Sequence, residues 1–110
     1  MNTTTEKTYR VEICLAGDVA DAKRVCREFC LSVGLCVAVA PTDFIYAGGS
    51  EAGVVVRLIN YPKYPSTKTT LWETAQSLAE NLRRALYQDS ALLVADDKTE
   101  WHSCRSAEEK

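Results

Sequence analysis

The chain has 110 residues, of which 46% are hydrophobic and 25% charged, a composition typical of one ordinary globular domain and not of a disordered chain. Thirteen basic and fifteen acidic residues give a net charge of −2. Because phosphate recognition needs clustered Lys and Arg, this balance disfavours general nucleic-acid binding.

The ends of the chain and its cysteines bear on where the protein works. The first seven residues are polar and no apolar run is long enough to span a bilayer, so we expect no signal peptide, no membrane contact and a cytoplasmic location. There are five cysteines, an odd number, and four of them lie inside apolar patterns. This pattern argues against a secreted disulfide scaffold.

Residues 8–15 alternate between apolar and polar side chains. A period of two predicts a strand with one buried face. That face carries Tyr9, Val11, Ile13 and Leu15, and the opposite face carries Arg10, Glu12 and Cys14.

A helix is predicted to follow, with Asp18 as its N-cap and Gly34 at its left-handed C-cap. Apolar residues recur at steps of three and four between these caps, which is the spacing of one buried helical stripe. The stripe contains Val19, Ala22, Cys26, Phe29, Cys30 and Val33.

Residues 35–46 and 53–61 are two apolar, β-rich runs around the Gly48-Gly49-Ser50 turn, which together predict a hairpin. Pro41 interrupts the first run. Because proline has no amide donor, that run is predicted to be an edge strand or to carry a bulge.

The prolines at 62 and 65 predict an irregular segment over residues 61–66. Thr70 with Glu73 then predicts a capping box for a second helix. The apolar stripe of that helix contains Leu71, Ala75, Leu78, Ala79, Leu82 and Leu86. A strand over 90–95, a turn at 96–98 and a short additional strand over 99–103 complete the chain.

The predicted order β-α-β-β-α-β is that of a ferredoxin-like α+β domain, with both helices on one face of an antiparallel sheet. The usual strand order of that architecture is 4-1-3-2 and places the second strand at the edge, in agreement with Pro41. We expect one domain over residues 8–103, with flexible tails over 1–7 and 104–110.

No helix remains to cover the second sheet face, which is predicted to carry Arg10, Glu12, Arg57 and Ile59. An uncovered face of mixed apolar and charged groups suits self-association or a protein partner. The alternative is that the arginines simply solvate the face, with Glu12 paired to one of them.

The segment from Tyr61 to Thr70 is the most distinctive local feature of the sequence. Tyr61, Lys63 and Tyr64 lie on a backbone stiffened by two prolines, and tyrosine is enriched at contact sites. Lys68 and Thr70 lie where a helix N-terminus can hold a small anionic ligand. The alternative is a rigid connector whose tyrosines cap the core, and this alternative is slightly favoured because every helix N-terminus has free amides.

No catalytic constellation is evident. Cys26 and Cys30 are one helical turn apart, but a zinc site needs four ligands and the sole histidine, His102, lies near the C-terminus. Buried packing of these thiols is preferred, with no metal and no cofactor expected. Asp96-Asp97 lacks the ligand spacing of a calcium loop and predicts a solvated turn.

The leading hypothesis is therefore a non-catalytic interaction or inhibitory accessory domain that acts by protein contact as a homo-oligomer such as a homodimer, including one from a virus or mobile element. No enzyme activity and no catalytic residue are predicted. The alternative is a small-molecule or nucleotide-binding protein that uses the Tyr61–Thr70 segment. A third hypothesis is an enzyme that uses His102 or Asp18 in a pocket between subunits.

Overall fold

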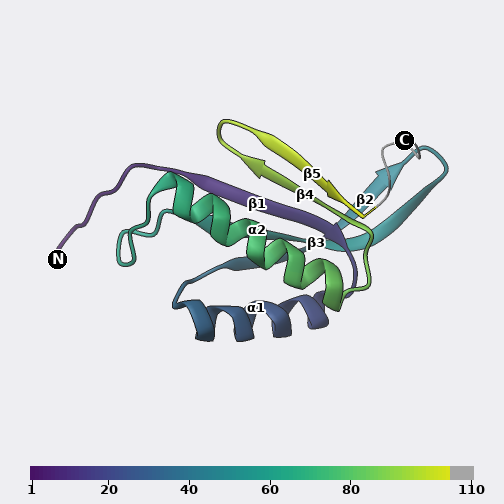
Figure 1. Cartoon of the computed structure of the whole chain (residues 1–110), viewed down its shortest axis with the longest axis horizontal. Helices are drawn as coiled ribbons and strands as arrows, with labels where there is room; N and C mark the ends of the chain where they lie inside the picture. Colours follow the sequence, from purple (N-terminus) through teal and green to yellow (C-terminus); the bar gives the residue numbers. More distant parts are fainter. Residues whose placement is uncertain (105–110) are drawn as a thin grey trace.

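The computed structural model describes residues 1–104 and contains two helices on one five-stranded antiparallel sheet (Figure 1). The strands run in the spatial order β2-β3-β1-β4-β5, and every neighbouring pair is antiparallel. The elements in chain order are β1 Arg10–Ala16, α1 Val19–Val33, β2 Ala38–Tyr46, β3 Gly49–Ile59, α2 Lys68–Ala85, β4 Ser90–Ala95 and β5 Thr99–Ser103.

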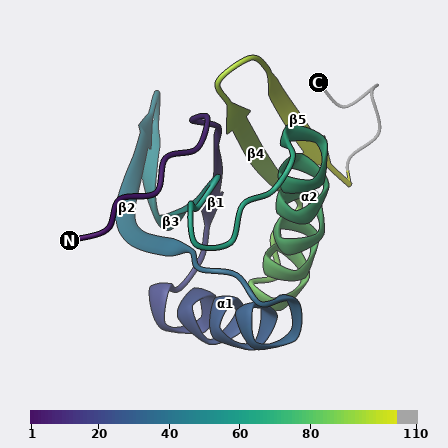
Figure 2. The same cartoon turned by 90° about the vertical axis from the view of Figure 1, so that its left-hand side faces the viewer.

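The core lies between the helices and one face of the sheet. From β1 and the residue before it, this face presents Tyr9, Val11, Ile13 and Leu15, all buried, which confirms the predicted parity. α2 packs on β1 and β4, α1 packs on β2 and β3, and the two helices contact each other (Figure 2). Both helices therefore cover the same face, and within residues 1–104 no helix covers the opposite face, here called the open face.

Local signals explain the ends of α1. The Asp18 carboxylate accepts a hydrogen bond from the Asp21 amide at 3.0 Å, and Gly34 adopts φ 76° where its amide bonds the Cys30 carbonyl. Both caps are as predicted. Asp18 is therefore engaged in starting a helix.

α2 begins earlier than predicted. Its N-cap is Thr67, whose hydroxyl accepts a hydrogen bond from the Thr70 amide at 3.1 Å. The predicted capping box at Thr70 and Glu73 is therefore wrong, because Thr67 offers the same side-chain oxygen one turn earlier.

The sheet differs from a simple four-stranded ferredoxin-like sheet because β5 adds a fifth strand beside β4. β2 lies at the opposite edge, so Pro41 occupies an edge strand as predicted. The β2–β3 hairpin continues past the end of β1, since β1 pairs with β3 only over Gly53–Ile59. Residues 43–46 and 49–52 thus form a two-stranded arm beyond the last pair of β1 with β3, with a hydrogen bond from the Gly17 amide to the Ala52 carbonyl at its base (Figure 1).

Gly53 stands where β3 leaves this arm and meets β1. A Cβ atom at this position would lie 2.5 Å from the Leu15 carbonyl oxygen and 2.5 Å from the Phe44 ring. Only glycine leaves room for the Phe44 ring and the Leu15 carbonyl to approach the backbone this closely.

Among helices of the described residues, none has the length and apolar character needed to cross a bilayer. Residues 105–110, most of the predicted C-terminal tail, lie outside the described part of the chain. The division into one domain with two tails stays a prediction.

Candidate functional site

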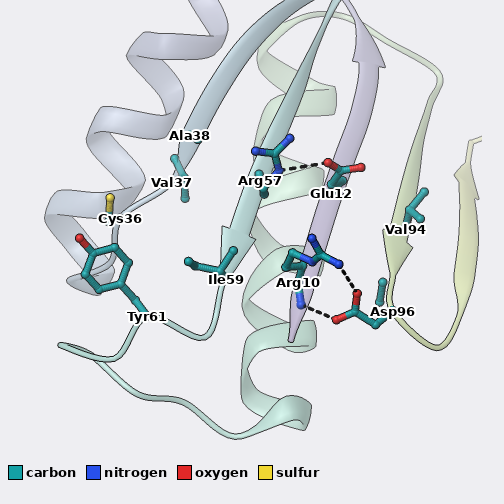
Figure 3. A pocket seen from close by; sticks show the side chains of 11 residues that line it. Arg10, Glu12, Cys36, Val37, Ala38, Arg57, Ile59, Tyr61, Val94 and Asp96 are labelled. Atoms are coloured by element: carbon teal, nitrogen blue, oxygen red, sulfur yellow. Dashed lines mark hydrogen bonds and ion pairs between the residues drawn. The ribbon is translucent and has the colours of Figure 1, made fainter. Parts of the chain in front are cut away.

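The open face is hollowed at one end of the sheet into a cavity of about 710 Å³ (Figure 3). This size is within the range of small-molecule sites. β1, β3 and β4 form its floor, and the segments before β2 and after β3 form its side. It is lined by Arg10, Glu12, Cys36, Val37, Ala38, Arg57, Ile59, Tyr61, Val94, Ala95 and Asp96.

Two arginine–carboxylate pairs cross the cavity floor. Arg57 Nε donates to Glu12 Oε2 at 3.1 Å, from neighbouring positions on β3 and β1. The Arg10 amide donates to Asp96 Oδ2 at 2.9 Å, and the Arg10 guanidinium lies 3.4 Å from Asp96 Oδ1. The two positive and two negative side chains give the cavity floor no net charge. The floor therefore suits a ligand that carries both a positive and a negative group.

These charged groups keep free capacity for a ligand. The side chains of Arg57 and Glu12 are 51% and 37% exposed, and those of Arg10 and Asp96 are 59% and 39% exposed. A guanidinium has five N–H donors, and each ion pair uses only part of them. The pair of Glu12 with Arg57 is the arrangement that the solvated-face alternative predicted.

The other wall of the cavity is apolar. Val37 and Ala38 lie on the β2 side, Ile59 and Tyr61 follow the end of β3, and Val94 lies on β4. Figure 3 shows the Tyr61 ring and the Cys36 thiol away from the Glu12–Arg57 pair. The cavity therefore combines a charged floor with an apolar and aromatic wall.

A second, smaller cavity of about 240 Å³ adjoins the first. Cys36, Ile59 and Tyr61 line both. Among residues 1–104, no Asp, Glu, Lys or Arg lines the second one. The rest of its wall is formed by Val33, Gly34, Leu35, Tyr64, Pro65, Ser66, Thr70, Leu71 and Thr74.

Five of the nine residues predicted for binding meet in the larger cavity, namely Arg10, Glu12, Arg57, Ile59 and Tyr61. Tyr64 and Thr70 line the smaller one. Their roles in binding stay predictions.

The two predicted lysines lie outside both cavities. Lys68 Nζ is 2.6 Å from Asp97 Oδ2, and Lys63 Nζ lies 5.6 Å from the centre of the Tyr64 ring. The hydrogen bond with Lys68 holds the pKa of Asp97 below its ordinary value. Lys68 is thus paired with the β4–β5 turn, and its role in holding an anion stays a prediction.

Sequence reasoning missed Asp96 and Cys36 as cavity residues. Asp96 was predicted to lie in a solvated turn, yet it folds back onto β1, where Asp97 also accepts a hydrogen bond from Tyr9 at 3.3 Å. The sequence held one signal for Asp96. The predicted strand order makes β4 an antiparallel neighbour of β1, and this pairing brings the turn after β4 to the start of β1.

His102 faces a different part of the molecule. Its Nε2 lies 2.8 Å from Glu100 Oε1, and Gln76 Nε2 donates to the same oxygen at 3.2 Å. The hydrogen bond with His102 lowers the pKa of Glu100. This cluster borders an open hollow beside Glu80 and Arg83 and is separate from both cavities.

The thiols show no metal arrangement. Within residues 1–104, no group of three or more His, Cys, Asp or Glu side chains is placed to hold a metal ion. Burial raises the pKa of Cys26 to about 11, which makes that thiol unreactive at neutral pH.

The fold and the cavity can be compared with known proteins. No protein-family model matches the sequence, and no curated protein matches it either. Two solved structures do match it in fold.

Both matching structures are of phage SAM lyase. The apo form superposes with a TM-score of 0.71 at 15% identity, over 89% of this chain and 90% of that one. The complex with S-methyl-5'-thioadenosine gives a TM-score of 0.67 at 14% identity, over 94% and 95% of the two chains. At this identity the likeness establishes a shared fold across nearly the whole length of both proteins.

These matches overturn the leading hypothesis of a non-catalytic interaction or inhibitory accessory domain, and with it the expectation of no enzyme activity. Both structures that share the fold are of an enzyme. The phage origin of these neighbours fits the expectation of a viral or mobile-element protein. A neighbour that binds a small nucleoside also favours the alternative hypothesis of a small-molecule site.

Proposed function

We propose that this chain is an enzyme that binds S-adenosylmethionine in the open-face cavity and cleaves it as a lyase, with release of S-methyl-5'-thioadenosine. The observation that carries the proposal is the balanced set of two arginines and two carboxylates in a cavity on a fold shared with SAM lyase. A small-molecule binder was also the alternative drawn from the sequence, although that alternative placed the ligand at the Tyr61–Thr70 segment.

The charged floor suits the amino-acid end of this substrate. That end is a zwitterion with one carboxylate and one ammonium group. Arg57 and Arg10 offer guanidinium donors for the carboxylate, and Glu12 and Asp96 offer oxygens for the ammonium. The arginines would attract a purely anionic ligand, but the carboxylates would repel it. We therefore replace the expectation of an anionic ligand with that of a zwitterionic one.

The chemistry of the step follows from the two compounds. S-Adenosylmethionine has a sulfonium bonded to methyl, 5'-adenosyl and the methionine Cγ. Release of S-methyl-5'-thioadenosine breaks the Cγ–S bond, and the electron pair of that bond goes to sulfur, which loses its positive charge. As a lyase reaction it uses no water. The broken bond at Cγ is replaced within the methionine fragment. Either the substrate's own carboxylate oxygen bonds to Cγ and closes a lactone, or Cβ loses a proton and a Cβ–Cγ double bond forms.

The apolar wall favours this step. Positive charge disappears from sulfur as the bond breaks, so surroundings that hydrate the sulfonium poorly lower the barrier. Val37, Ile59 and Val94 supply such surroundings. The cavity thus holds the charged end of the substrate on its floor while the sulfonium lies against apolar side chains.

Incubation with S-adenosylmethionine, followed by liquid chromatography and mass spectrometry, tests the activity. We expect S-methyl-5'-thioadenosine to accumulate without a methyl acceptor. Arg57→Gln should reduce its formation at least tenfold. Arg24→Gln is the matched control, because Arg24 is a half-exposed, ion-paired arginine on α1. Intact substrate after incubation with the wild-type protein, or S-adenosylhomocysteine as the product, would refute the proposal.

Three earlier expectations belong with this proposal. They are a ferredoxin-like arrangement extended by β5, association with further copies of the chain, and a cytoplasmic location. The exposed Trp101, Tyr46 and Ile45 support self-association, since large apolar side chains in solvent favour contact. Sedimentation velocity of the purified chain distinguishes monomer from oligomer.

A further inference from the structure

The two adjoining cavities differ in charge in a way that matches the two ends of one ligand. Of the residues that the structure describes, four charged side chains line the larger cavity and none lines the smaller. S-Adenosylmethionine is likewise a charged amino-acid end joined to a neutral, flat adenine ring. A neutral aromatic ring loses less hydration in an uncharged cavity, whereas the zwitterion needs charged partners.

Polar groups in the smaller cavity can recognise the edge of a base. Thr70 Oγ1 accepts a hydrogen bond from Thr67 Oγ1 at 2.9 Å and keeps its own proton to donate. Thr74 Oγ1 donates to the Thr70 carbonyl at 2.8 Å and keeps a lone pair to accept. One free donor and one free acceptor therefore lie one helical turn apart.

We propose that the smaller cavity binds the adenine ring of the substrate, with Thr70 donating to a ring nitrogen and Thr74 accepting from the exocyclic amino group. This assignment rests on the proposed function. It goes further by dividing the substrate between two cavities and by naming the residues that select adenine. Guanine and hypoxanthine present a ring N–H and an exocyclic oxygen, which reverse the donor and acceptor order along that edge.

Tyr61 lies at the junction, because it lines both cavities. Its ring centre is 6.0 Å from that of Tyr64. A substrate that spans the two cavities passes this ring between its adenine and its amino-acid end, where the sulfonium stands.

Calorimetric titration with two probes tests the division. S-Methyl-5'-thioadenosine carries the adenine but lacks the amino-acid end, and S-adenosylmethionine carries both. Thr74→Val should weaken binding of both probes about tenfold, the loss of one hydrogen bond to the ligand. Thr74→Ser, which keeps the hydroxyl, should restore it. Arg57→Gln should weaken only S-adenosylmethionine.

A third probe tests base selection. S-Inosylmethionine, the deaminated analogue, should bind the wild-type protein at least tenfold more weakly than S-adenosylmethionine. In the Thr74→Val protein this preference should shrink, because the acceptor that reads the amino group is gone.

The outcomes separate the two proposals. Failure of the wild-type protein to bind S-adenosylmethionine and S-methyl-5'-thioadenosine would remove the proposed function. Tight binding of both with no effect of Thr74→Val would overturn only the placement of adenine. An equal effect of Arg57→Gln on the two probes would overturn the division of the substrate between the two cavities, including the amino-acid end on the charged floor. Circular dichroism melting of each variant confirms that it is folded before titration.

Discussion

The ion pair between Arg57 and Glu12 offers a test of whether the cavity floor serves stability or binding. The two side chains meet at 3.1 Å and are 51% and 37% exposed. Ion pairs exposed to this degree contribute about 0.2–1 kcal/mol. A double-mutant cycle with Glu12→Gln, Arg57→Gln and the double variant should therefore give a coupling free energy below about 1 kcal/mol by urea unfolding.

The same substitutions should affect binding more strongly. A hydrogen bond between a guanidinium and a bound carboxylate is worth about 1.5–3 kcal/mol, which corresponds to more than about tenfold in Kd. Arg57→Gln should thus lower the melting temperature by no more than about 4–8 °C, which is the shift expected for about 1 kcal/mol of stability. The affinity of the same variant for S-adenosylmethionine should fall more than about tenfold. A coupling above about 2 kcal/mol with unchanged affinity would show that the pair is structural and that the floor does not bind the substrate.

Three further outcomes follow from the packing and the titrating groups. Gly53→Ala places a Cβ atom 2.5 Å from the Leu15 carbonyl oxygen and should lower the free energy of unfolding, measured by urea titration, by about 2 kcal/mol or more. Gly49→Ala is the control and should lower it less, because the nearest atom to its Cβ is 3.4 Å away. Equal losses of stability in the two variants would contradict the close approach at Gly53. The pKa of Asp97 lies below its ordinary 3.8 because of the hydrogen bond with Lys68, so the stability from this carboxylate is present above about pH 4 and is lost as the pH falls through the folded-state pKa. Lys68→Gln should reduce this loss of stability at acid pH, measured as the fall in melting temperature with pH. An unchanged fall would show that Lys68 is not its cause. Iodoacetamide should modify the exposed Cys36 and Cys104 well before Cys26, because Cys26 is buried and its pKa is raised to about 11. Peptide mass spectrometry follows the modification, and early modification of Cys26 would mean that α1 opens readily.

Periodicity predicted the core because burial follows parity directly. In β1 the alternation from Tyr9 to Leu15 defined which face meets the helices, and the register then placed Glu12 opposite Arg57 on the other face. The capped ends of α1 were predicted as well, because Asp18 and Gly34 each satisfy a local requirement.

The rest of the cavity depends on long-range folding that no local pattern encodes. Asp96 reaches the floor only because the β4–β5 turn bends back to β1, and Cys36 does so because the chain between α1 and β2 passes the end of β3. The start of α2 was missed because Thr67 and Thr70 offer equivalent capping oxygens. Enzyme activity was missed because the cavity is assembled from single residues on separate strands, which leave no compact motif.

The arm formed by the ends of β2 and β3 gives the molecule two levels of local stability. Its residues lie beyond the last pair of β1 with β3, and Ile45 at its tip is 82% exposed. A two-stranded ribbon is marginally stable in water by itself. Amide hydrogens in residues 43–52 should therefore exchange with deuterium through local opening, long before those of the central strand β1 exchange through global unfolding.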